Sequence, residues 1–323
     1  MTFTLTPDTA GAYLVRRGLV PADVAIHVDE LPGGVSAAVI AVRVPATGLA
    51  VVVKQALPQL RVRDEWLAKP ERAETEVEAM RLCVTITPGV VPRILDSDPA
   101  EHVLVMELLP EDALNWQAEV GEGRVHPSAG VWAGATLGTW HAATTNPPPP
   151  FDDFEAFEQL RLRPFHETTM ARLPDQAQLI APYLADLRAR RRCLVHGDYS
   201  MKNMLLGPSG RFVLDFEVAH VGNPVFDLAF FLSFVVLSAI RWPQAAAELE
   251  ELADGFLTAY ATAAGNGFAG DIASIAGHTA CLLLARTDGK SPALFLDEPS
   301  RVRARSIGTE MLSAPERGLW LWA

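Results

Sequence analysis

The chain has 323 residues, of which 49% are hydrophobic, and it carries 39 Asp and Glu against 27 Lys and Arg, for a formal net charge of −12. This length and hydrophobic content allow a large buried core in two domains or two lobes, which excludes a disordered protein. The acidic balance disfavours a broad basic surface, so we expect no nucleic-acid partner.

The cysteines and the apolar runs indicate a cytoplasmic protein. Cys83, Cys193 and Cys281 lie far apart, with no CxxC motif and no histidine at zinc-like spacing, as expected of buried thiols in a reducing compartment. The N-terminus has no basic segment that leads into an apolar run, so we expect no secretory signal. The 13-residue apolar run 228–240 suits a buried helix and is too short to span a bilayer, so we expect no membrane partner.

Residues 24–54 are rich in Val, Ile and Ala and are interrupted by the turns LPGG and PATG. This pattern predicts three strands in two consecutive hairpins. Gly33 and Gly34 lie in the first turn, where they would let backbone N–H groups approach phosphate oxygens. The alternative is that the two glycines form an ordinary tight turn.

Lys54 ends the third strand, after three valines. Such a lysine can reach out to water, but the motifs further along favour the lysine that contacts the α- and β-phosphates of a nucleotide. A helix predicted at 70–84 can supply the carboxylate that holds it. At about 100° per residue, Glu76 borders the apolar face of this helix, whereas Glu74 and Glu78 point away. We therefore expect Glu76 to pair with Lys54; a solvated glutamate or a shift of register to Glu74 or Glu78 is the alternative.

Two further strand-like runs, 91–98 and 102–110, bring the first lobe to five strands and one helix. The segment 106–109 would be the crossover into a second lobe, and its backbone groups would be available to an adenine edge. Glu107 and Leu109 are therefore candidate nucleotide contacts, Glu107 through its backbone.

From residue 109 onward the apolar spacing becomes helical. A helix is predicted at 130–144, with Trp132, Leu137 and Trp140 in the core and His141 as a hydrogen-bonded histidine. The tract NPPPP ends that helix.

The segment 151–165 has clustered acids, which suggest a solvated helix face or, as the alternative, part of a pocket for a hydroxylated and possibly cationic acceptor. The C-terminal third is helical by pattern. Its segment 285–292 contains charged residues that we expect to cap and pair structurally, with a contact to the acceptor as the alternative. Trp320 and Trp322 would dock on the lobe or on a second subunit, which predicts a monomer or a homodimer. The charged residues of these two segments are Asp152, Asp153, Glu155, Glu158, Arg286, Asp288 and Lys290.

Most of the candidate catalytic and metal-binding residues lie in the motif HGDYSMKN and in the run FVLDF that follows it. Asp198 is followed five residues later by Asn203 and then, at the end of the next apolar run, by Asp215. In kinases with this spacing, one Asp faces the acceptor hydroxyl while the Asn and the second Asp hold Mg²⁺. A hairpin turn at GPSGR would bring Asn203 and Asp215 close enough to share the cation. Together with Lys54, the combination is a specific signal for phosphoryl transfer.

Four segments resemble the aminoglycoside phosphotransferase and choline kinase superfamily: VVVKQALPQLRV, ERAETEVEAM, LVHGDYSMKN and LDFEVAHVGNPVFDLAFF. The first two are similar to its methylthioribose-kinase-like branch, and the last two match the wider superfamily. The resemblance implies that Asp198 is the catalytic base, that Asn203 and Asp215 bind Mg²⁺, that Lys54 meets the phosphates of ATP, and that Glu76 positions Lys54.

The resemblance also implies that Asp227 braces the catalytic loop; a helix N-cap is its alternative role. Some positions depart from the family pattern. Lys202 follows Asp198 by four residues and could touch the transferred phosphate or brace the loop. Asn223 replaces the acid of a frequent GDP triplet. Ser36, a candidate phosphate contact in the first turn, stands near a position where relatives frequently carry Asn.

The expected fold is therefore α+β, bilobal and protein-kinase-like, with a five-stranded antiparallel lobe at 1–108 and a mostly helical lobe at 109–323. Only twelve positions separate Asp215 from Asp227, without an APE motif, so there is no room for the activation loop of a protein kinase. We expect transfer of the γ-phosphoryl group of ATP, with Mg²⁺, to a hydroxyl of an aminoglycoside-like molecule, an amino alcohol or a sugar such as methylthioribose. The alternatives are a nucleotide-binding pseudokinase that acts through partners and a nucleotidyl transferase.

Overall fold

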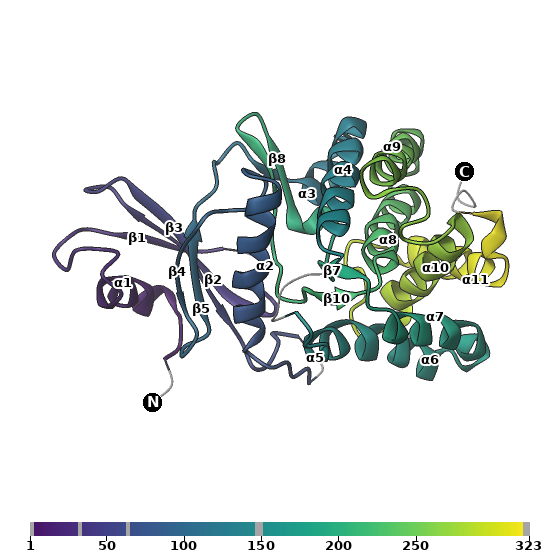
Figure 1. The fold of residues 1–323 in the computed structure, drawn as a ribbon, viewed down its shortest axis with the longest axis horizontal. Coiled ribbons are helices and arrows are strands. Elements are labelled where there is room, and N and C mark those ends of the chain that lie inside the picture. The colour runs from purple at the N-terminus through teal and green to yellow at the C-terminus, as the bar shows by residue number, and fades with distance from the viewer. Residues whose placement is uncertain (1–2, 32–33, 63–64, 146–150, 319–323) are drawn as a thin grey trace. The chain divides into compact units, whose positions relative to one another are not determined.

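The computed structural model describes residues 3–31, 34–62, 65–145 and 151–318. The chain divides into two compact units, an N-terminal unit, Met1–Glu111, and a C-terminal unit, Asp112–Ala323 (Figure 1). Gly33, Trp320, Trp322 and the tract NPPPP lie outside the described residues. The functional roles that the sequence predicts for the two lobes, with a boundary after residue 108, stay predictions.

An antiparallel sheet of five strands, in the order β1-β2-β3-β5-β4, forms most of the N-terminal unit (Figure 1). The predicted five-stranded antiparallel sheet is therefore confirmed, as is the helix after the third strand. The elements of this unit are α1 (Pro7–Arg16), β1 (His27–Glu30), β2 (Ala37–Val44), β3 (Leu49–Ala56), α2 (Arg72–Ile86), β4 (Ile94–Asp98) and β5 (Val103–Glu107).

The first helix, α1, is an element that the sequence analysis did not predict. Its start is a capping box, in which Thr6 Oγ1 accepts from Thr9 N and Thr9 Oγ1 accepts from Thr6 N. Apolar residues of α1 pack in one core cluster with Val51 and Val53 of β3. Because side chains alternate along a strand, Lys54 points to the opposite face of the sheet.

The C-terminal unit is mostly helical, with two short sheets. One sheet pairs β7 with β10, and the other has the order β6-β8-β9. The elements are β6 (Leu114–Asn115), α3 (Trp116–Gly121), α4 (Pro127–Ala143), α5 (Glu155–Phe157), the π-helix η1 (Glu158–Glu167), α6 (Thr168–Arg172), α7 (Ala177–Ala189), β7 (Cys193–Val195), the 3₁₀ turn η3 (Met201–Asn203), β8 (Met204–Gly207), β9 (Gly210–Val213), β10 (His220–Gly222), α8 (Val225–Arg241), α9 (Ala246–Ala264), α10 (Ile272–Asp288) and α11 (Glu298–Ser313).

Helix α8 is the centre of this unit. Its residues from Val225 to Ile240 are all buried, because the helix is apolar around its whole circumference. The predicted buried helix at 228–240 is thereby confirmed. In the described part of the chain, no single helix is long and apolar enough to cross a membrane, although one pair bent by 118°, Val225–Arg241 with Pro243–Ala264, has the length and composition.

Helices α4 and α9 pack closely because glycines line their contact. Added Cβ atoms at Gly130 and Gly134 would overlap the carbonyl oxygens of Leu252 and Phe256. The predicted core positions Leu137 and Trp140 are buried, with 0% and 3% of their surfaces exposed. Trp132 is only half-buried, so its prediction as a core residue was wrong.

The segment 151–165 does not form one regular helix. The short helix α5 continues into the π-helix η1, in which Pro164 interrupts the usual helical hydrogen bonding. In η1, Arg161 and His166 are buried together with Leu160, Leu162 and Phe165. The acids Asp152, Asp153 and Glu155 are exposed, as predicted for a solvated charge run, whereas much of η1 is internal and the single regular helix expected there is absent.

We expect Gly134→Ala to lower the free energy of unfolding by about 1–3 kcal/mol, as overpacked cores do. In a helix, alanine is more favourable than glycine by about 1 kcal/mol. The variant is destabilised only because the overlap of its Cβ with Phe256 O costs more than this gain. Urea denaturation measures the change. The control Val131→Ala alters an exposed side chain of the same helix and should shift stability by less than about 0.5 kcal/mol. A more stable Gly134→Ala variant would contradict the prediction.

Candidate active site

The loop that carries Asp198 begins where β7 ends. Its backbone turns at Gly197, which has φ +77° and where a Cβ would lie 2.8 Å from Val218 O, so only glycine fits there without strain. The N–H groups of His196 and Gly197 both donate to the Asp227 carboxylate, at 2.7 and 2.8 Å. The expected bracing of the catalytic loop by Asp227 is therefore confirmed.

Asp227 is completely buried, and its position differs from the alternative prediction. Helix α8 begins at Val225, so Asp227 lies in the first turn of α8 and is not its N-cap. Burial by itself raises the pKa of Asp227, but the hydrogen bond and charge of His141, 3.3 Å away, together with His196, lower it below its usual value. His141 Nδ1 in turn lies 2.9 Å from the Tyr260 hydroxyl, which confirms His141 as a hydrogen-bonded core histidine.

The Asp198 side chain is almost fully enclosed, with 2% of its surface exposed. Lys202 Nζ and Asn203 Nδ2 each donate to Asp198 Oδ2 at 2.6 Å. On the other side, Arg161 Nη2 forms an ion pair with Asp198 Oδ1 at 2.8 Å, while Arg161 Nε donates to Gly197 O at 2.7 Å. These contacts hold the carboxylate in one orientation.

His196 connects this loop to the strand that precedes Asp215. Its Nδ1 accepts a hydrogen bond from Asp198 N at 3.1 Å, so its Nε2 carries the proton and donates to Leu214 O at 3.2 Å. Burial lowers the pKa of His196, against the opposing effect of nearby carboxylates that include Asp227 and Asp198. The imidazole is thus neutral near pH 7 and acts as a fixed bridge.

Asn203 and Asp215 lie side by side at the open end of a hairpin. The predicted hairpin is present, with Met204 of β8 opposite Val213 of β9, and Leu214 N donates to Asn203 O at 2.9 Å. Both residues lie just outside the two strands, Asn203 directly before β8 and Asp215 two residues after the end of β9. Asp215 has φ +72°, an unusual conformation for a non-glycine residue that costs about 1–3 kcal/mol and is concentrated at functional sites.

Asn203 and Asp215 offer the oxygen donors that hard divalent cations prefer. Among the described residues there is no group of three or more His, Cys, Asp or Glu that could hold a metal by itself. Mg²⁺ is usually bound by one or two protein oxygens together with phosphate and water. The donor set therefore fits a cation that a nucleotide helps to hold.

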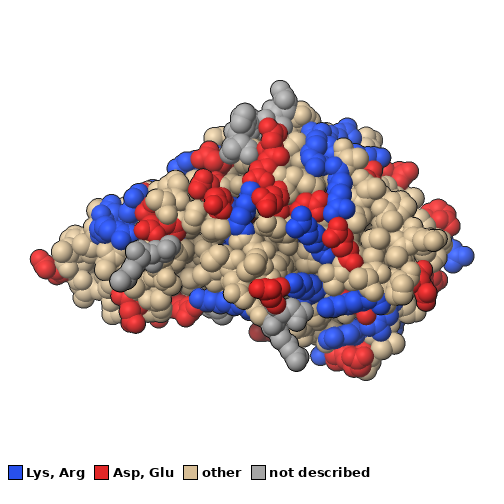
Figure 2. Space-filling view, turned by 90° about the horizontal axis from the view of Figure 1, so that it is seen from below, with Lys and Arg blue, Asp and Glu red and all other residues tan. Residues whose placement is uncertain are grey.

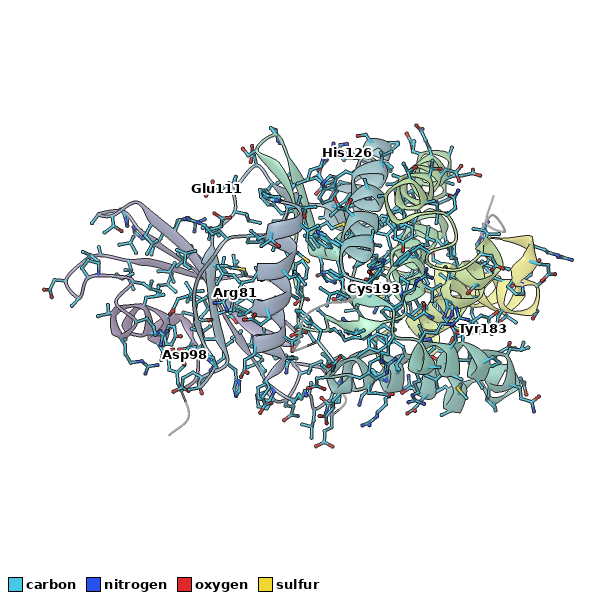
Figure 3. The ribbon with its side chains drawn as sticks, in the orientation of Figure 1. Arg81, Asp98, Glu111, His126, Tyr183 and Cys193 are labelled. Atoms are coloured by element: carbon cyan, nitrogen blue, oxygen red, sulfur yellow. The ribbon has the colours of Figure 1, made fainter. Side chains whose placement is uncertain are left out.

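In the N-terminal unit, Lys54 Nζ lies 2.7 Å from Glu76 Oε1, and both side chains are buried. The predicted pairing is therefore present. The two alternative partners lie elsewhere: Glu78 accepts from Arg81 of the same helix at 2.6 Å, and Glu74 is 3.7 Å from His102. Arg81 is labelled on α2 in Figure 3. Whether Lys54 contacts phosphate stays a prediction.

The first turn, between β1 and β2, is held by its backbone. A Cβ at Gly34 would overlap Ala37 O, so the turn needs glycine there. Ser36 O accepts from Leu57 N at 2.9 Å and from Arg72 Nη2 at 2.5 Å. The phosphate contacts predicted for Gly34 and Ser36 stay predictions.

In the crossover segment, the N–H of Glu107 donates to Arg93 O and the N–H of Leu108 donates to Ala50 O. Within the described residues the N–H of Leu109 has no such bond, and Leu109 is thus the amide donor that this segment can offer. The N–H of Glu107 is already bonded to the carbonyl of Arg93, the residue before β4, so the backbone role predicted for Glu107 would fall to its carbonyl group.

Two arginines shape the candidate site and were missed by the sequence analysis. Arg161, which holds Asp198, lies in the run LRLRPF, where a charge between leucines was the available signal. Arg72 is completely buried and donates to four backbone carbonyls, those of Ser36, Leu57, Ala68 and Lys69. It ties the first turn to the start of α2, and no sequence pattern indicates this.

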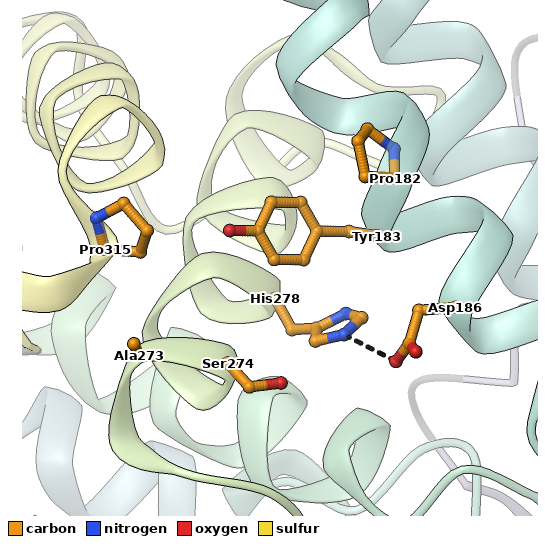
Figure 4. Close-up of a pocket in the computed structure, with 7 residues that line it drawn as sticks. All are labelled: Pro182, Tyr183, Asp186, Ala273, Ser274, His278 and Pro315. Carbon is orange, nitrogen blue, oxygen red and sulfur yellow. Dashed lines mark hydrogen bonds and ion pairs between the residues drawn. The ribbon is translucent and has the colours of Figure 1, made fainter.

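A pocket of about 340 Å³ lies between α7 and α10 (Figure 4), and none of the predicted site residues lines it. His278 Nε2 lies 3.3 Å from Asp186 in this pocket (Figure 4). Asp186 is also paired with Arg190 at 2.7 Å and accepts from Asn223 at 2.7 Å. Its carboxylate is therefore already engaged, and Asn223 has a structural role here.

A rigidly held loop with an oriented carboxylate, beside an amide and a second acid, is typical of one class of proteins, the phosphotransferases of kinase-like fold. The model of the phosphotransferase enzyme family matches residues 27–269, and the chain belongs to that family. The chain is therefore a small-molecule kinase, and the α+β kinase-like fold and the superfamily expected from the sequence are confirmed.

The individual proteins to which this chain is similar are also described as kinases. The chain is 24% identical over 276 residues to a methylthioribose kinase of Geobacillus sp. (strain WCH70), across 74% of this chain and 67% of that protein. A choline/ethanolamine kinase family protein from Mesorhizobium loti has a TM-score of 0.58 and 16% identity, covering 96% of this chain and 100% of that one. Amicoumacin kinase hAmiN, solved with AMP-PNP, Ca²⁺ and Ami, has a TM-score of 0.57 and 13% identity, covering 96% and 94%.

We expect Asp227→Ala to lower the free energy of unfolding by about 3–5 kcal/mol, because it leaves the buried N–H groups of His196 and Gly197 without an acceptor. Urea denaturation at pH 7 measures the loss. Asp254→Ala, at an exposed acid of α9, is the control and should change stability by less than about 0.5 kcal/mol.

The wild type and Asp227→Ala should also differ in how the free energy of unfolding depends on pH. Since the pKa of Asp227 is lowered in the folded state, its stabilisation is fully present above the unfolded pKa of about 3.9 and is lost as the pH falls through the folded value. The difference in the free energy of unfolding between the wild type and Asp227→Ala should therefore become smaller below pH 4. A difference that stays constant from pH 7 to pH 3 would contradict this role.

Proposed function

We propose that this kinase transfers the γ-phosphoryl group of ATP to a hydroxyl of a small molecule, with Asp198 as the catalytic base. The observation that carries the proposal is the Asp198 carboxylate, buried and held by Arg161, Lys202 and Asn203 on a loop that Asp227 braces. Buried and oriented carboxylates of this kind occur where a proton must be accepted at one place.

In the proposed reaction, the acceptor oxygen attacks the γ-phosphorus, the bond from that phosphorus to the bridging oxygen of ADP breaks, and the hydroxyl proton passes to Asp198. Asn203 and Asp215 would hold Mg²⁺, which neutralises phosphate charge when it is bound. Lys54, positioned by Glu76, would contact the α- and β-phosphates, and Gly33, Gly34 and Ser36 would lie along them.

The N-terminal unit would bind the nucleotide, with the backbone of Leu109 meeting the adenine edge. Support for ATP and a divalent cation comes from the kinase family and from the AMP-PNP and Ca²⁺ of the amicoumacin kinase. A cytoplasmic location and a monomer or homodimer remain predictions of the sequence.

The acceptor class is open among aminoglycoside-like molecules, amino alcohols and sugars. The methylthioribose kinase relative favours a methylthioribose-type sugar as one candidate. A pseudokinase that only binds nucleotide is the alternative from another class, and the presence of the Asn and Asp metal donors weighs against it. ADP release over a panel of these acceptors separates the possibilities.

We expect Asp198→Asn to reduce kcat by about 10²–10⁴-fold, because the amide cannot accept the acceptor proton. Binding of Mg-ATP, followed by thermal stabilisation, should remain close to that of the wild type. Asp175→Asn, at an exposed aspartate, is the matched control and should retain full activity. Turnover by Asp198→Asn near the wild-type rate would remove Asp198 from the mechanism.

A further inference from the structure

Two arginines lie against one aromatic face of α8. The Arg161 guanidinium is 5.7 Å from the ring centroid of Phe230, and that of Arg286 is 5.2 Å from the ring centroid of Phe234. Phe230 and Phe234 are one helical turn apart, with ring centroids separated by 5.5 Å. The two guanidinium groups, on η1 and α10, are close enough to interact electrostatically, and Arg161 pairs with the candidate base, Asp198.

Arg286 differs from Arg188 and Arg305 of this unit in its partners. Its Nη1 donates to the backbone and hydroxyl oxygens of Ser291 at 2.7 and 3.0 Å. Its Nε is buried without a hydrogen-bond partner, and no carboxylate lies within 4.0 Å of its guanidinium among the residues that the structure describes. Arg188 and Arg305, by contrast, each form a two-point pair with a carboxylate, Glu158 and Asp288.

The charge of Arg286 persists at neutral pH. Burial lowers its pKa to about 10, Asp198 opposes this shift, and Arg161 adds to it. Arg161 and Lys202 both pair with the single carboxylate of Asp198, so this carboxylate is not a direct partner of Arg286. A buried guanidinium without an anion is unfavourable, and it binds carboxylate or phosphate groups in a planar, two-point geometry.

The acids that could favour a cationic acceptor are engaged elsewhere or exposed. Both carboxylate oxygens of Glu158 accept from Arg188 at 2.7 Å. Asp152 is exposed. On the face shown in Figure 2, basic and acidic side chains lie beside one another.

We propose that the acceptor carries an anionic group, a carboxylate or a phosphate, close to the hydroxyl that is phosphorylated, and that Arg286 binds this group beside Arg161. Asp198 then faces the hydroxyl, while the anionic group of the substrate supplies the partner that the Arg286 guanidinium lacks. This inference rests on the proposed function, since it names the substrate class of the same site. The contact of Arg286 with Ser291 fixes its side chain and confirms the structural pairing predicted for it.

The first experiment compares acceptors that share a skeleton and differ in charge: gluconate, glucose and glucosamine, then glycerate, glycerol and ethanolamine. ADP release gives kcat and KM for each. We expect an acidic member to have the highest kcat/KM, and Arg286→Gln to raise its KM about tenfold or more, with Arg286→Lys intermediate. A preferred cationic member, or a charge preference that Arg286→Gln leaves unchanged, would overturn the proposal.

The second experiment does not depend on turnover. Malonate, which has two carboxylates and no hydroxyl, is titrated against the protein in saturating Mg-ADP, and thermal stability is followed. We expect malonate to stabilise the wild type and to lose most of this effect in Arg286→Gln. Arg192→Gln is the matched control, because Arg192 also lies over an aromatic ring, that of Phe268 at 4.0 Å, and donates to a backbone carbonyl.

The outcomes separate this inference from the proposed function. Phosphoryl transfer to a cationic acceptor would leave the function standing and remove the anionic subsite. Malonate stabilisation that depends on Arg286, without ADP release from any acceptor, would support the subsite and count against the function. Equal malonate effects in the wild type and in Arg286→Gln would exclude Arg286 as an anion-binding residue.

Discussion

The C-terminal unit depends on one buried carboxylate, that of Asp227. It sits in the first turn of the most buried helix, α8, and accepts the N–H groups of His196 and Gly197. A helix that is buried on all sides can hardly move without disturbing the whole core. The loop that carries Asp198 is hydrogen-bonded to this helix and is therefore held rigidly as well. Removing a carboxylate from water is costly, and here two backbone donors and His141 compensate for that cost.

Hydrogen bonds connect the loop that Asp227 holds to the other candidate site residues. His196 accepts from Asp198 N and donates to Leu214 O, so the loop of the candidate base and the strand before Asp215 share one imidazole. Asn203 then bonds both to Asp198 and, through its carbonyl, to Leu214 N. The strained backbone of Asp215 is tolerable because its neighbour Leu214 is fixed on both sides.

Much of the fold and of the site could be predicted because the relevant patterns are local. Strand alternation and helical periodicity placed Lys54 and Glu76 on facing surfaces, and the structure shows their 2.7 Å contact. The errors arise where tertiary packing overrides local pattern. Trp132 has helical spacing but is half-buried, and the helix that Asp227 was expected to cap starts at Val225, three residues earlier than expected. Arg161 could not be assigned, because its role depends on a π-helix that brings it to a loop 36 residues away.

The distribution of these groups also explains how a phosphotransferase can change its acceptor. The candidate base and the candidate metal donors lie on a loop and hairpin that Asp227 and His196 hold by backbone contacts, so little substitution is possible there. Arg161 and Arg286 instead come from η1 and α10, and each reaches the site with a long side chain that lies over a ring of α8. A different residue at either position would change the charge offered to the acceptor without altering the loop that holds Asp198, except for the contacts of Arg161 itself. In the proposed mechanism, charge selectivity and transfer chemistry therefore lie on different elements, and Arg161 contacts both through Asp198 and the rings of α8.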